Sequence, residues 1–479
     1  MKEVIRSADP RVAALIERQA TQYAGRDYLG LERVSKLLEK LGRPQDRLPP
    51  VFHVAGTNGK GSTCAFLRAG LEAAGKRVHA FTSPHLVRYN ERIRIAGKLI
   101  GDQALGELMG RILDANEEIG ASLFEVNTAV AFLAFSQAPA DACIVEVGLG
   151  GRLDATNVIE QPLVTGIASL GLDHQAFLGN KMTDVAGEKA GIAKRGVPLV
   201  TQLYPAALAK KVGEVAHGAG AIWEPRGLHW DAIVRQGKLH YHDRDGELPL
   251  PLPRLSGRHQ ALNAALAVAM LRHQSAIDIP PSALGAAMGW ADWPARLQQL
   301  HSGPLLEMLP RGSELWIDGG HNPSAAQLVA AHARRNWKDG MPLVLLFASL
   351  ASKDAAGVLR PFRGVANQVQ TLPIDGHESR DPDDLVTLAA EMGFSARSYR
   401  GVAGALVGVR KKARVLVFGS LYLAGEALSL NGTLPDLSTA RASPSPTTPA
   451  VPIELSTSPL RIINQNRMMP GSAATVVSQ

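Results

Sequence analysis

The segment VFHVAGTNGKGSTCAFLRAGLEAA, residues 51–74, decides the fold of this chain. Its first five residues form an apolar run that predicts a β-strand, and apolar side chains at positions 64, 67, 71 and 74 return at helical spacing. Between the two lies GTNGKGS, residues 56–62, in which three residues are glycine and Lys60 is the only long side chain. The segment therefore predicts a strand, a glycine turn and a helix in direct succession.

The glycine turn is suited to a phosphate group. Small residues let backbone N–H groups converge on an anion at a helix N-terminus, where the helix dipole also favours negative charge. The strict P-loop pattern G-x-x-x-x-G-K-[ST] is not met, because Val54 replaces the first glycine and Gly61 separates Lys60 from Ser62. We interpret the turn as a nucleotide triphosphate site, with a plain strand-to-helix connection as the alternative. Its residues are Gly56, Thr57, Asn58, Gly59, Lys60, Gly61 and Ser62.

Strands and helices alternate along the chain after this turn, which predicts an α/β fold with a largely parallel sheet. The alternation begins again after WPAR, residues 293–296, so we expect a hinge near 293–300 and a second, smaller α/β domain. The expected domains are 1–295, which carries the P-loop, and 296–433. The expected strands and helices are 78–83, 102–118, 141–151, 163–168, 197–201, a hairpin region at 220–250 with an Asp-Gly turn, and an alanine-rich helix at 259–272.

The last part of the chain, residues 434–479, is rich in Ser, Thr and Pro and has few large apolar residues. Such a composition predicts a disordered tail, because little apolar surface is available for burial.

Composition and charge narrow the class of protein. Hydrophobic residues make up 46% of the 479 residues and charged residues 20%, as in ordinary globular proteins. The sequence has no membrane-span pattern, and the charged N-terminus lacks the core of a signal peptide, so we expect a cytoplasmic protein. Cys64 and Cys143 lie in apolar patterns, which argues against a disulfide framework or a zinc site.

The formal net charge of +7 comes from scattered basic residues without an aromatic stripe. It therefore favours small polyanionic substrates over DNA or RNA, and a generally basic proteome is the alternative explanation.

Two further segments follow neighbouring predicted strands. FTSPHLVRYNERIRI, residues 81–95, offers Ser83 and several charged side chains where ligands of parallel sheets bind, although a solvated polar loop is the alternative. In IVEVGLGGRLDATN, residues 144–157, Glu146 lies in an apolar run, where an ionised carboxylate is costly unless it is paired or binds a metal. Because Mg²⁺ prefers oxygen ligands, we interpret Glu146 as a magnesium ligand, with a salt bridge as the alternative. Arg152 and Asp154, after the glycines, are interpreted as charges at the rim of the site.

Asp173 and His174 follow another apolar strand in SLGLDHQAFLGN, residues 169–180. A single His is more often structural than a metal ligand. We therefore interpret His174 as a candidate ligand only together with Glu146. Lys189, in EKAGI, is by itself typical of a solvated helix surface.

The candidate site of the second domain consists of the motif WIDGGHNP, residues 316–323, and the segment ASLASKD, residues 348–354. Asp318 closes a strand and is suited to bind a ribose or a nucleotide phosphate environment across the cleft between domains. Capping of the next helix by Asn322, directly before Pro323, explains the end of the motif equally well.

Together these segments resemble the folylpolyglutamate synthase/dihydrofolate synthase family, a branch of the amide ligases that includes the Mur ligases. The resemblance covers about residues 20–430. The motifs that carry it, in chain order, are HVAGTNGKGS, FTSPHLVRYNERIRI, VEVGLGGRLDATN, LDHQAFLG, EKAGIAK, HQALNAALA, WPARLQ and DGGHNP.

The resemblance implies a P-loop domain joined to a smaller Rossmann-like domain, and ATP-dependent ligation of L-glutamate to dihydropteroate and reduced folates. It implies ATP, two Mg²⁺ ions and a place for a monovalent cation as cofactors, and we expect a monomer. The residues matching catalytic positions are Lys60, His174 and Lys189, the last being carbamylated in many relatives. Those matching magnesium ligands are Ser83, Glu146, His174 and Lys189. Those matching nucleotide contacts outside the P-loop are Asn263, Arg296, Asp318 and His321. Those matching substrate contacts are Asp27, Leu29, Gly30, Arg33, Ser122, Phe124, Glu125, Arg152 and Asp154.

Two departures from the family pattern concern loop geometry. Ala295 stands before Arg296 where relatives commonly have glycine, and Gly320 replaces a usual alanine. A Mur-type ligase is one alternative, but only about 55 residues precede the P-loop here, whereas Mur ligases carry a substantial N-terminal domain. A nonenzymatic ATP-binding regulator is the other, and the presence of Lys60, Glu146 and His174 argues against it.

Overall fold

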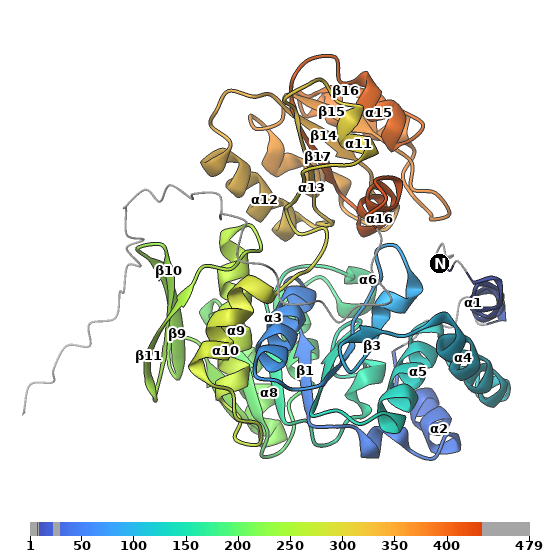
Figure 1. Ribbon diagram of the computed structural model, residues 1–479, viewed down its shortest axis with the longest axis vertical. Helices are drawn as coiled ribbons and strands as arrows, with labels where there is room; N and C mark the ends of the chain where they lie inside the picture. Colours follow the sequence, from blue (N-terminus) through green and yellow to red (C-terminus); the bar gives the residue numbers. More distant parts are fainter. Residues whose placement is uncertain (1–6, 8, 23–28, 434–479) are drawn as a thin grey trace, which may run out of the picture.

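The computed structural model describes residues 7, 9–22 and 29–433, which form two lobes (Figure 1). The predicted tail, 434–479, and Asp27 lie outside the described residues. The larger lobe is built on an eight-stranded sheet with strand order β4-β3-β2-β5-β1-β6-β7-β8. The strands are β1 Val51–Ala55, β2 Val78–Phe81, β3 Ile93–Ile95, β4 Lys98–Leu99, β5 Ala142–Glu146, β6 Val164–Ile167, β7 Pro198–Thr201 and β8 Ile222–Pro225.

The strands from β2 to β8 in this order are parallel, and only the edge pairs β2–β3 and β3–β4 are antiparallel. Register brings Val54 of β1 opposite Glu146 of β5 on one side and Gly166 of β6 on the other. The carboxyl ends of these strands therefore meet beside the glycine turn, as expected for βαβ connections.

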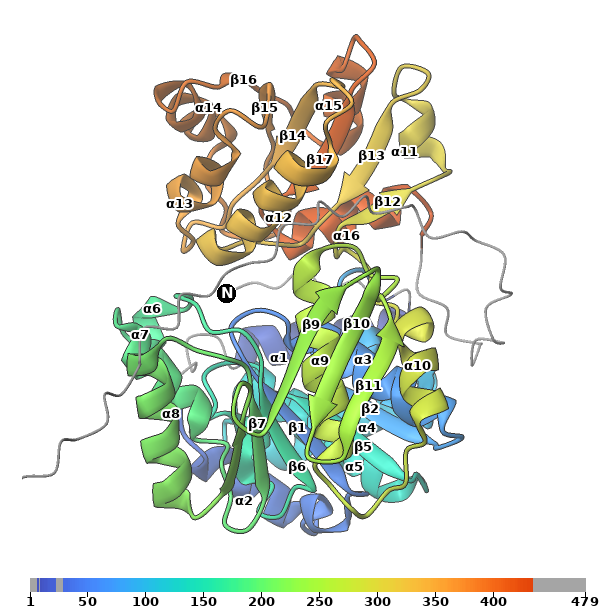
Figure 2. The same ribbon diagram turned by 90° about the vertical axis from the view of Figure 1, so that its left-hand side faces the viewer.

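Helices cover both faces of the large sheet. On one face, α3, α9 and α10 bury Phe66, Leu266 and Met288, and a second sheet of β9, β10 and β11 packs outside them (Figure 2). On the other face, α1, α2, α4 and α5 form a separate apolar core. The bounds are α1 Pro10–Gln22, α2 Glu32–Lys40, α3 Lys60–Ala73, α4 Asp102–Asn116, α5 Leu123–Gln137, α6 Gln175–Leu178, α7 Met182–Ala190, α8 Ala206–Ala219, α9 Arg258–Arg272, α10 Pro281–Trp290, β9 Trp230–Arg235, β10 Lys238–Asp243 and β11 Gly246–Pro251.

The smaller lobe contains a six-stranded sheet with the order β12-β13-β17-β14-β15-β16, parallel except for the edge strand β12. One face packs on α15 and α16, and the other on α12, α13 and α14. The bounds are β12 Gln298–Leu300, β13 Glu314–Ile317, β14 Leu343–Phe347, β15 Gln368–Thr371, β16 Ser395–Ser398, β17 Arg414–Phe418, α11 Pro304–Glu307, α12 Pro323–Asn336, α13 Ala355–Leu359, α14 Pro382–Glu391, α15 Val402–Gly408 and α16 Leu421–Leu430; short 3₁₀ segments lie at Pro44–Arg47, Tyr89–Arg92, Ala155–Val158 and Arg360–Phe362.

The predicted fold class is confirmed: a P-loop lobe with a mostly parallel sheet, followed by a smaller α/β lobe. The predicted hairpin is also present, with Arg244 and Asp245 connecting β10 to β11 and Gly246 opposite Asp243. The domain boundary at 295/296 stays a prediction. Within the part of the chain that the structure describes, none of the helices has both the length and the apolarity needed to cross a bilayer.

Candidate active site

Four adjacent strands, β2, β5, β1 and β6, end at the surface that faces the smaller lobe. The loops that follow them line a cleft of about 1200 Å³ whose other wall comes from the smaller lobe. The predicted residues that line this cleft are the P-loop residues 56–62, Ser83, Glu146, His174, Lys189, Asn263, Arg296, Asp318 and His321. Segments far apart in the sequence thus share one site.

The P-loop connects β1 directly to α3, which begins at Lys60. Gly59 precedes it at φ 87°, a conformation that side chains other than glycine rarely adopt, and a Cβ there would overlap the amide of Asn263. The Lys60 ammonium donates to the carbonyl of Gly56 at 3.0 Å, so it lies over the loop. Among the described residues, the hydroxyl of Ser62 is buried without a hydrogen-bond partner, which fits a ligand at the helix N-terminus.

Glu146 and Ser83 come together beside this loop. Glu146 is only 3% exposed, and its carboxylate accepts a hydrogen bond from the Ser83 backbone N–H at 3.2 Å. Burial raises the pKa of Glu146, and the charge of Lys60 acts in the opposite direction. The carboxylate therefore lies within the electrostatic influence of the P-loop lysine, and its role as a magnesium ligand stays a prediction.

His174 lies in the segment that follows β6. Partial burial in the cleft lowers its pKa to about 4, and the ammonium groups of Lys353 and Lys60 act in the same direction against the carboxylate of Asp173. The imidazole is therefore neutral near pH 7, which is the form that binds metals. Its backbone lies in the left-handed region, with φ 52°.

Lys189 lies on α7 and is 5% exposed, so it is not the solvated helix residue that its local sequence suggests. Burial lowers the pKa of its amine to about 7, and Lys60 adds to the effect. A neutral amine is the form that reacts with CO₂ to give a carbamate, so these surroundings fit the predicted modification. The loop after β5 runs along this helix, since Arg152 N–H donates to the Glu188 carbonyl at 2.8 Å.

The connection between the lobes is organised by Asp318, at the end of β13. Its two oxygens accept from the backbone N–H groups of Leu297, at 2.8 Å, and Gly320, at 2.7 Å. Burial raises the pKa of Asp318, while Arg296 lowers it. The carboxylate thus ties the backbone of the hinge, at Leu297, to the loop after β13, at Gly320, in addition to facing the cleft.

Both departures from the family pattern have structural consequences here. Ala295 adopts φ 56°, where an alanine is strained and a glycine is not, so this loop keeps the conformation at a cost of about 1 kcal/mol. At Gly320, a Cβ would lie 2.7 Å from the ring of Phe418 and 2.9 Å from the Asp318 carboxylate. The large ring at position 418 therefore favours glycine at position 320.

The predicted substrate residues lie on the far side of Gly148, along α2 and α5. The Arg33 guanidinium pairs with the Glu125 carboxylate at 2.8 Å. Glu125 also accepts from the backbone N–H of Ser122 at 2.7 Å, which closes a capping box at the start of α5. The Phe124 ring packs directly against Gly148, which lines the cleft. Leu29 and Gly30 lie just before α2.

Arg152 and Asp154 have different surroundings from the charged rim that the sequence suggests. Arg152 pairs with Glu188 at 2.8 Å on the outer side of α7. Asp154 is buried and accepts from the N–H of Leu149, at 2.8 Å, and from the hydroxyl of Thr156, at 2.5 Å. Asp154 therefore fixes the shape of the glycine loop after β5, and the role of both residues in binding substrate stays a prediction.

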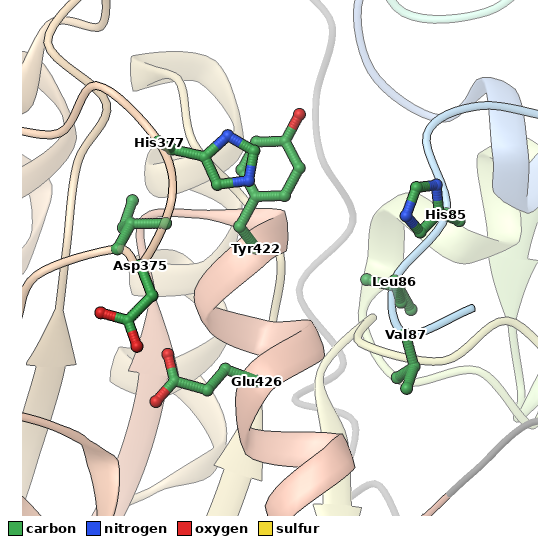
Figure 3. Close-up of a pocket in the computed structure, with 8 residues that line it drawn as sticks. His85, Leu86, Val87, Asp375, His377, Tyr422 and Glu426 are labelled. Atoms are coloured by element: carbon green, nitrogen blue, oxygen red, sulfur yellow. The ribbon is translucent and has the colours of Figure 1, made fainter. Parts of the chain in front are cut away.

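A second contact between the lobes joins the loop after β2 to α16 (Figure 3). Gly425 packs so closely against the carbonyl of Leu86 that a Cβ would overlap it, and Val87 is buried in the core of the smaller lobe. A cavity of about 20 Å³ lies beside this contact, where the rings of His377 and Tyr422 are stacked with centroids 3.7 Å apart. The loop that carries Ser83 is therefore in direct contact with the smaller lobe.

The donor groups of the site fit magnesium. Among the described residues, no group of three or more His, Cys, Asp or Glu side chains is arranged to hold a metal ion. Mg²⁺ commonly takes one or two carboxylates and completes its shell with water and phosphate oxygens. A buried carboxylate beside a serine and a phosphate-binding loop therefore meets its requirements.

Comparisons with known proteins identify relatives of this chain. No family model matches, but individual proteins match over most of the chain. The dihydrofolate synthase/folylpolyglutamate synthase of Escherichia coli K12 is 33% identical over 407 residues, which cover 84% of this chain and 91% of the relative. The chain belongs to the dihydrofolate synthase/folylpolyglutamate synthase family. The dihydrofolate synthetase of Saccharomyces cerevisiae is 31% identical, covering 85% of this chain and 98% of the relative.

Solved structures of the family share the fold. E. coli FolC, in complex with DHPP and ADP, superposes with a TM-score of 0.80 at 32% identity, covering 89% of this chain and 98% of that chain. Folylpolyglutamate synthase of Mycobacterium tuberculosis, complexed with ADP and AMPPCP, gives a TM-score of 0.78 at 30% identity, covering 89% and 100%.

The segment ASLASKD was predicted as part of the site, but without an individual role for Lys353, which lines the cleft after β14 and pairs with Asp173. The signal was the position of ASLASKD, residues 348–354, directly after an apolar strand. Asn322 caps α12 by accepting from Ala325 N–H at 2.9 Å, which confirms the capping explanation, and it also contacts Asn58 of the P-loop at 2.9 Å. The family motif therefore has both a local and an interlobe function.

Proposed function

We propose that this chain is an ATP-dependent ligase that joins L-glutamate to dihydropteroate, giving dihydrofolate, and to reduced folates, giving folylpolyglutamates. The observation that carries the proposal is the convergence of Lys60, Glu146, His174 and Lys189 on one cleft between two lobes. The family relatives support it, since E. coli FolC binds DHPP and ADP, and another bifunctional synthase structure contains Mn, AMPPNP and L-glutamate.

The chemistry explains the need for ATP. A carboxylate is a poor electrophile because its leaving group would be oxide. Transfer of the γ-phosphoryl group of ATP to the folate carboxylate gives an acyl phosphate and ADP. The amine of L-glutamate then attacks the acyl carbon, a C–N bond forms, the C–O bond to phosphate breaks, and the amine loses a proton. The products are the amide, ADP and inorganic phosphate.

Different residues of the cleft have different roles in this reaction. The N–H groups at the start of α3 and the Lys60 ammonium bind and orient the phosphates of ATP. Magnesium ions, when bound, offset the negative charge of the phosphate and carboxylate oxygens. Ser83 and Glu146 would hold one ion, and His174 with the carbamate of Lys189 would hold the other.

The smaller lobe completes the nucleotide site. Arg296 lies in the hinge and Asp318 accepts from the hinge backbone at Leu297. Asn263 of the larger lobe packs on Gly59 of the P-loop, so we expect both lobes to bind the nucleotide. Closure over the phosphates excludes water, which would otherwise hydrolyse the acyl phosphate. The buried free thiols of Cys64 and Cys143 fit a reducing cytoplasm, and we propose a cytoplasmic monomer.

The proposal is tested by incubating the protein with Mg²⁺, ATP and L-glutamate, and with either 7,8-dihydropteroate or tetrahydrofolate monoglutamate as acceptor. Mass spectrometry should detect one added glutamate on dihydropteroate and further glutamates on the reduced folate, and Lys60→Ala should give neither product. Failure of both acceptors in folded, ATP-binding protein would overturn the folate assignment.

A further inference from the structure

The carboxylate of Asp173 connects the two lobes. It lies in the larger lobe, after β6, and its side chain is 9% exposed. Lys353 forms an ion pair with it, His321 Nε2 lies 3.3 Å from Oδ2, and Asn322 Nδ2 donates to the same oxygen at 3.3 Å. All three partners belong to the smaller lobe and come from segments that begin at least 140 residues further along the chain. One carboxylate therefore contacts two separate loops of the opposite lobe.

The same carboxylate holds the backbone of His174. Its Oδ1 accepts from the His174 N–H at 2.8 Å. His174 has φ 52°, a left-handed conformation that costs a residue other than glycine free energy and persists only when surrounding contacts maintain it. The hydrogen bond from its own N–H to Asp173 is one such contact.

The other end of this segment is fixed to the P-loop. Thr57 N–H donates to the Ser169 carbonyl at 2.8 Å, and the Thr57 hydroxyl donates to the Gly171 carbonyl at 2.9 Å. A Cβ on Gly171 would lie 2.8 Å from the hydroxyl of Ser324, so the smaller lobe also approaches the backbone here. Residues 169–174 are thus held between the nucleotide loop and the smaller lobe.

We propose that Asp173 is a positioning residue that makes the orientation of His174 depend on docking of the smaller lobe through Lys353. This inference rests on the proposed function, because the effect on catalysis requires the ligase reaction. When the lobes separate, Asp173 loses Lys353, His321 and Asn322 together, and its carboxylate is free to turn away from the His174 N–H. When they dock, the ion pair fixes the carboxylate and, with it, the backbone that aims the imidazole into the cleft.

The ion pair has the surroundings that such coupling needs. The Lys353 side chain is 12% exposed, so both charges are largely removed from water, and leaving one of them without its partner is costly. A surface pair, by contrast, would contribute little to holding the lobes in register. The buried pair therefore distinguishes the docked arrangement from a separated one.

The first test measures hydrogen exchange of the ligand-free protein, which requires no substrate or metal. Asp173→Asn removes the charge from the larger lobe, and Lys353→Met removes it from the smaller lobe at similar length. Both variants should exchange faster than the wild type in residues 170–176 and 319–326, while the interior strands β1 and β5 keep their protection. Asp243→Asn is the matched control, because the Asp243 side chain is also buried, at 2% exposed, but pairs with Arg272 inside the larger lobe.

Unchanged exchange at 170–176 in both variants would overturn the proposal, and so would an equal change in the Asp243→Asn control. Because this experiment uses no reaction, its result stands whether or not the ligase assignment is correct. A folded Lys353→Met protein keeps the test valid if Asp173→Asn fails to fold.

The second test is kinetic. Each single variant should lower kcat by roughly tenfold, the size typical of coupling between groups in contact, while the KM for ATP changes by less than about twofold. The double variant should lose no more than the worse single variant, because both act through one ion pair. Asp173→Glu should restore part of kcat. Multiplication of the two losses in the double variant, or a KM effect without a kcat effect, would contradict the coupling.

Discussion

His53 should make this protein less stable as the solution is acidified below neutral pH. It lies on β1, fully buried, and its Nε2 lies 2.8 Å from the hydroxyl of Thr156. That hydroxyl donates its own proton to Asp154, so the imidazole Nε2 must be the donor toward Thr156. Nδ1 is buried without a partner among the described residues, and burial lowers the pKa of His53 to about 3.

The sign and size of this loss of stability follow from the difference in proton binding between the folded and unfolded states. In the unfolded chain the imidazole has a pKa of about 6.5, so the unfolded state binds the extra proton as the pH falls through this value. Stability is therefore complete above pH 6.5 and is lost toward pH 3, at about 1.4 kcal/mol per pH unit. Between pH 7 and pH 5 the loss from His53 alone is about 2 kcal/mol.

The variant His53→Gln isolates this contribution, because a glutamine amide can donate to Thr156 but does not titrate. Guanidinium unfolding of both proteins, followed by circular dichroism at pH 7 and pH 5, gives the two differences in free energy of unfolding. Other histidines whose pKa is lowered, such as His259 and His332, affect both proteins equally. The wild type should lose about 2 kcal/mol more than the variant. An equal loss in the two proteins would refute the conclusion that His53 is buried in its neutral form.

Three further predictions concern the cleft and the contact between the loop after β2 and α16. Lys60→Ala should abolish ATP turnover measured by phosphate release, because the phosphates lose their cation, and near-normal turnover would refute the P-loop assignment. Lys189→Ala should lower ligase activity, and added short carboxylates should restore part of it by replacing the carbamate; no loss at all would exclude the carbamate role. Gly425→Ala should reduce kcat, since the new Cβ would push the Leu86 carbonyl and the Ser83 loop away from α16. Its melting temperature should change by only a few degrees, and a normal kcat would show that this contact is not needed for the reaction.

The P-loop was predictable because its signals are local. An apolar run, a glycine turn and helical spacing lie within 24 consecutive residues, 51–74, and the adjacent position of Glu146 follows from parallel pairing of β5 with β1. Capping by Asn322 was predictable for the same reason, since the cap and its helix are contiguous.

The interlobe contacts were not predictable, because nothing local specifies them. Asp173 and Lys353 are 180 residues apart and meet only when both lobes are folded and docked. Asp154 looks like a rim charge in the sequence, yet tertiary packing buries it in hydrogen bonds to Leu149 and Thr156. The local pattern of Lys189 likewise suggests a solvated helix, and packing against the loop after β5 removes it from water.

The most direct test of the account is the mass of the products formed from Mg²⁺, ATP, L-glutamate and either 7,8-dihydropteroate or tetrahydrofolate monoglutamate. The account predicts one added glutamate on dihydropteroate and chain extension of the reduced folate, both absent with Lys60→Ala. If neither acceptor gains mass in folded protein that binds ATP, the assignment of this cleft to folate ligation is contradicted.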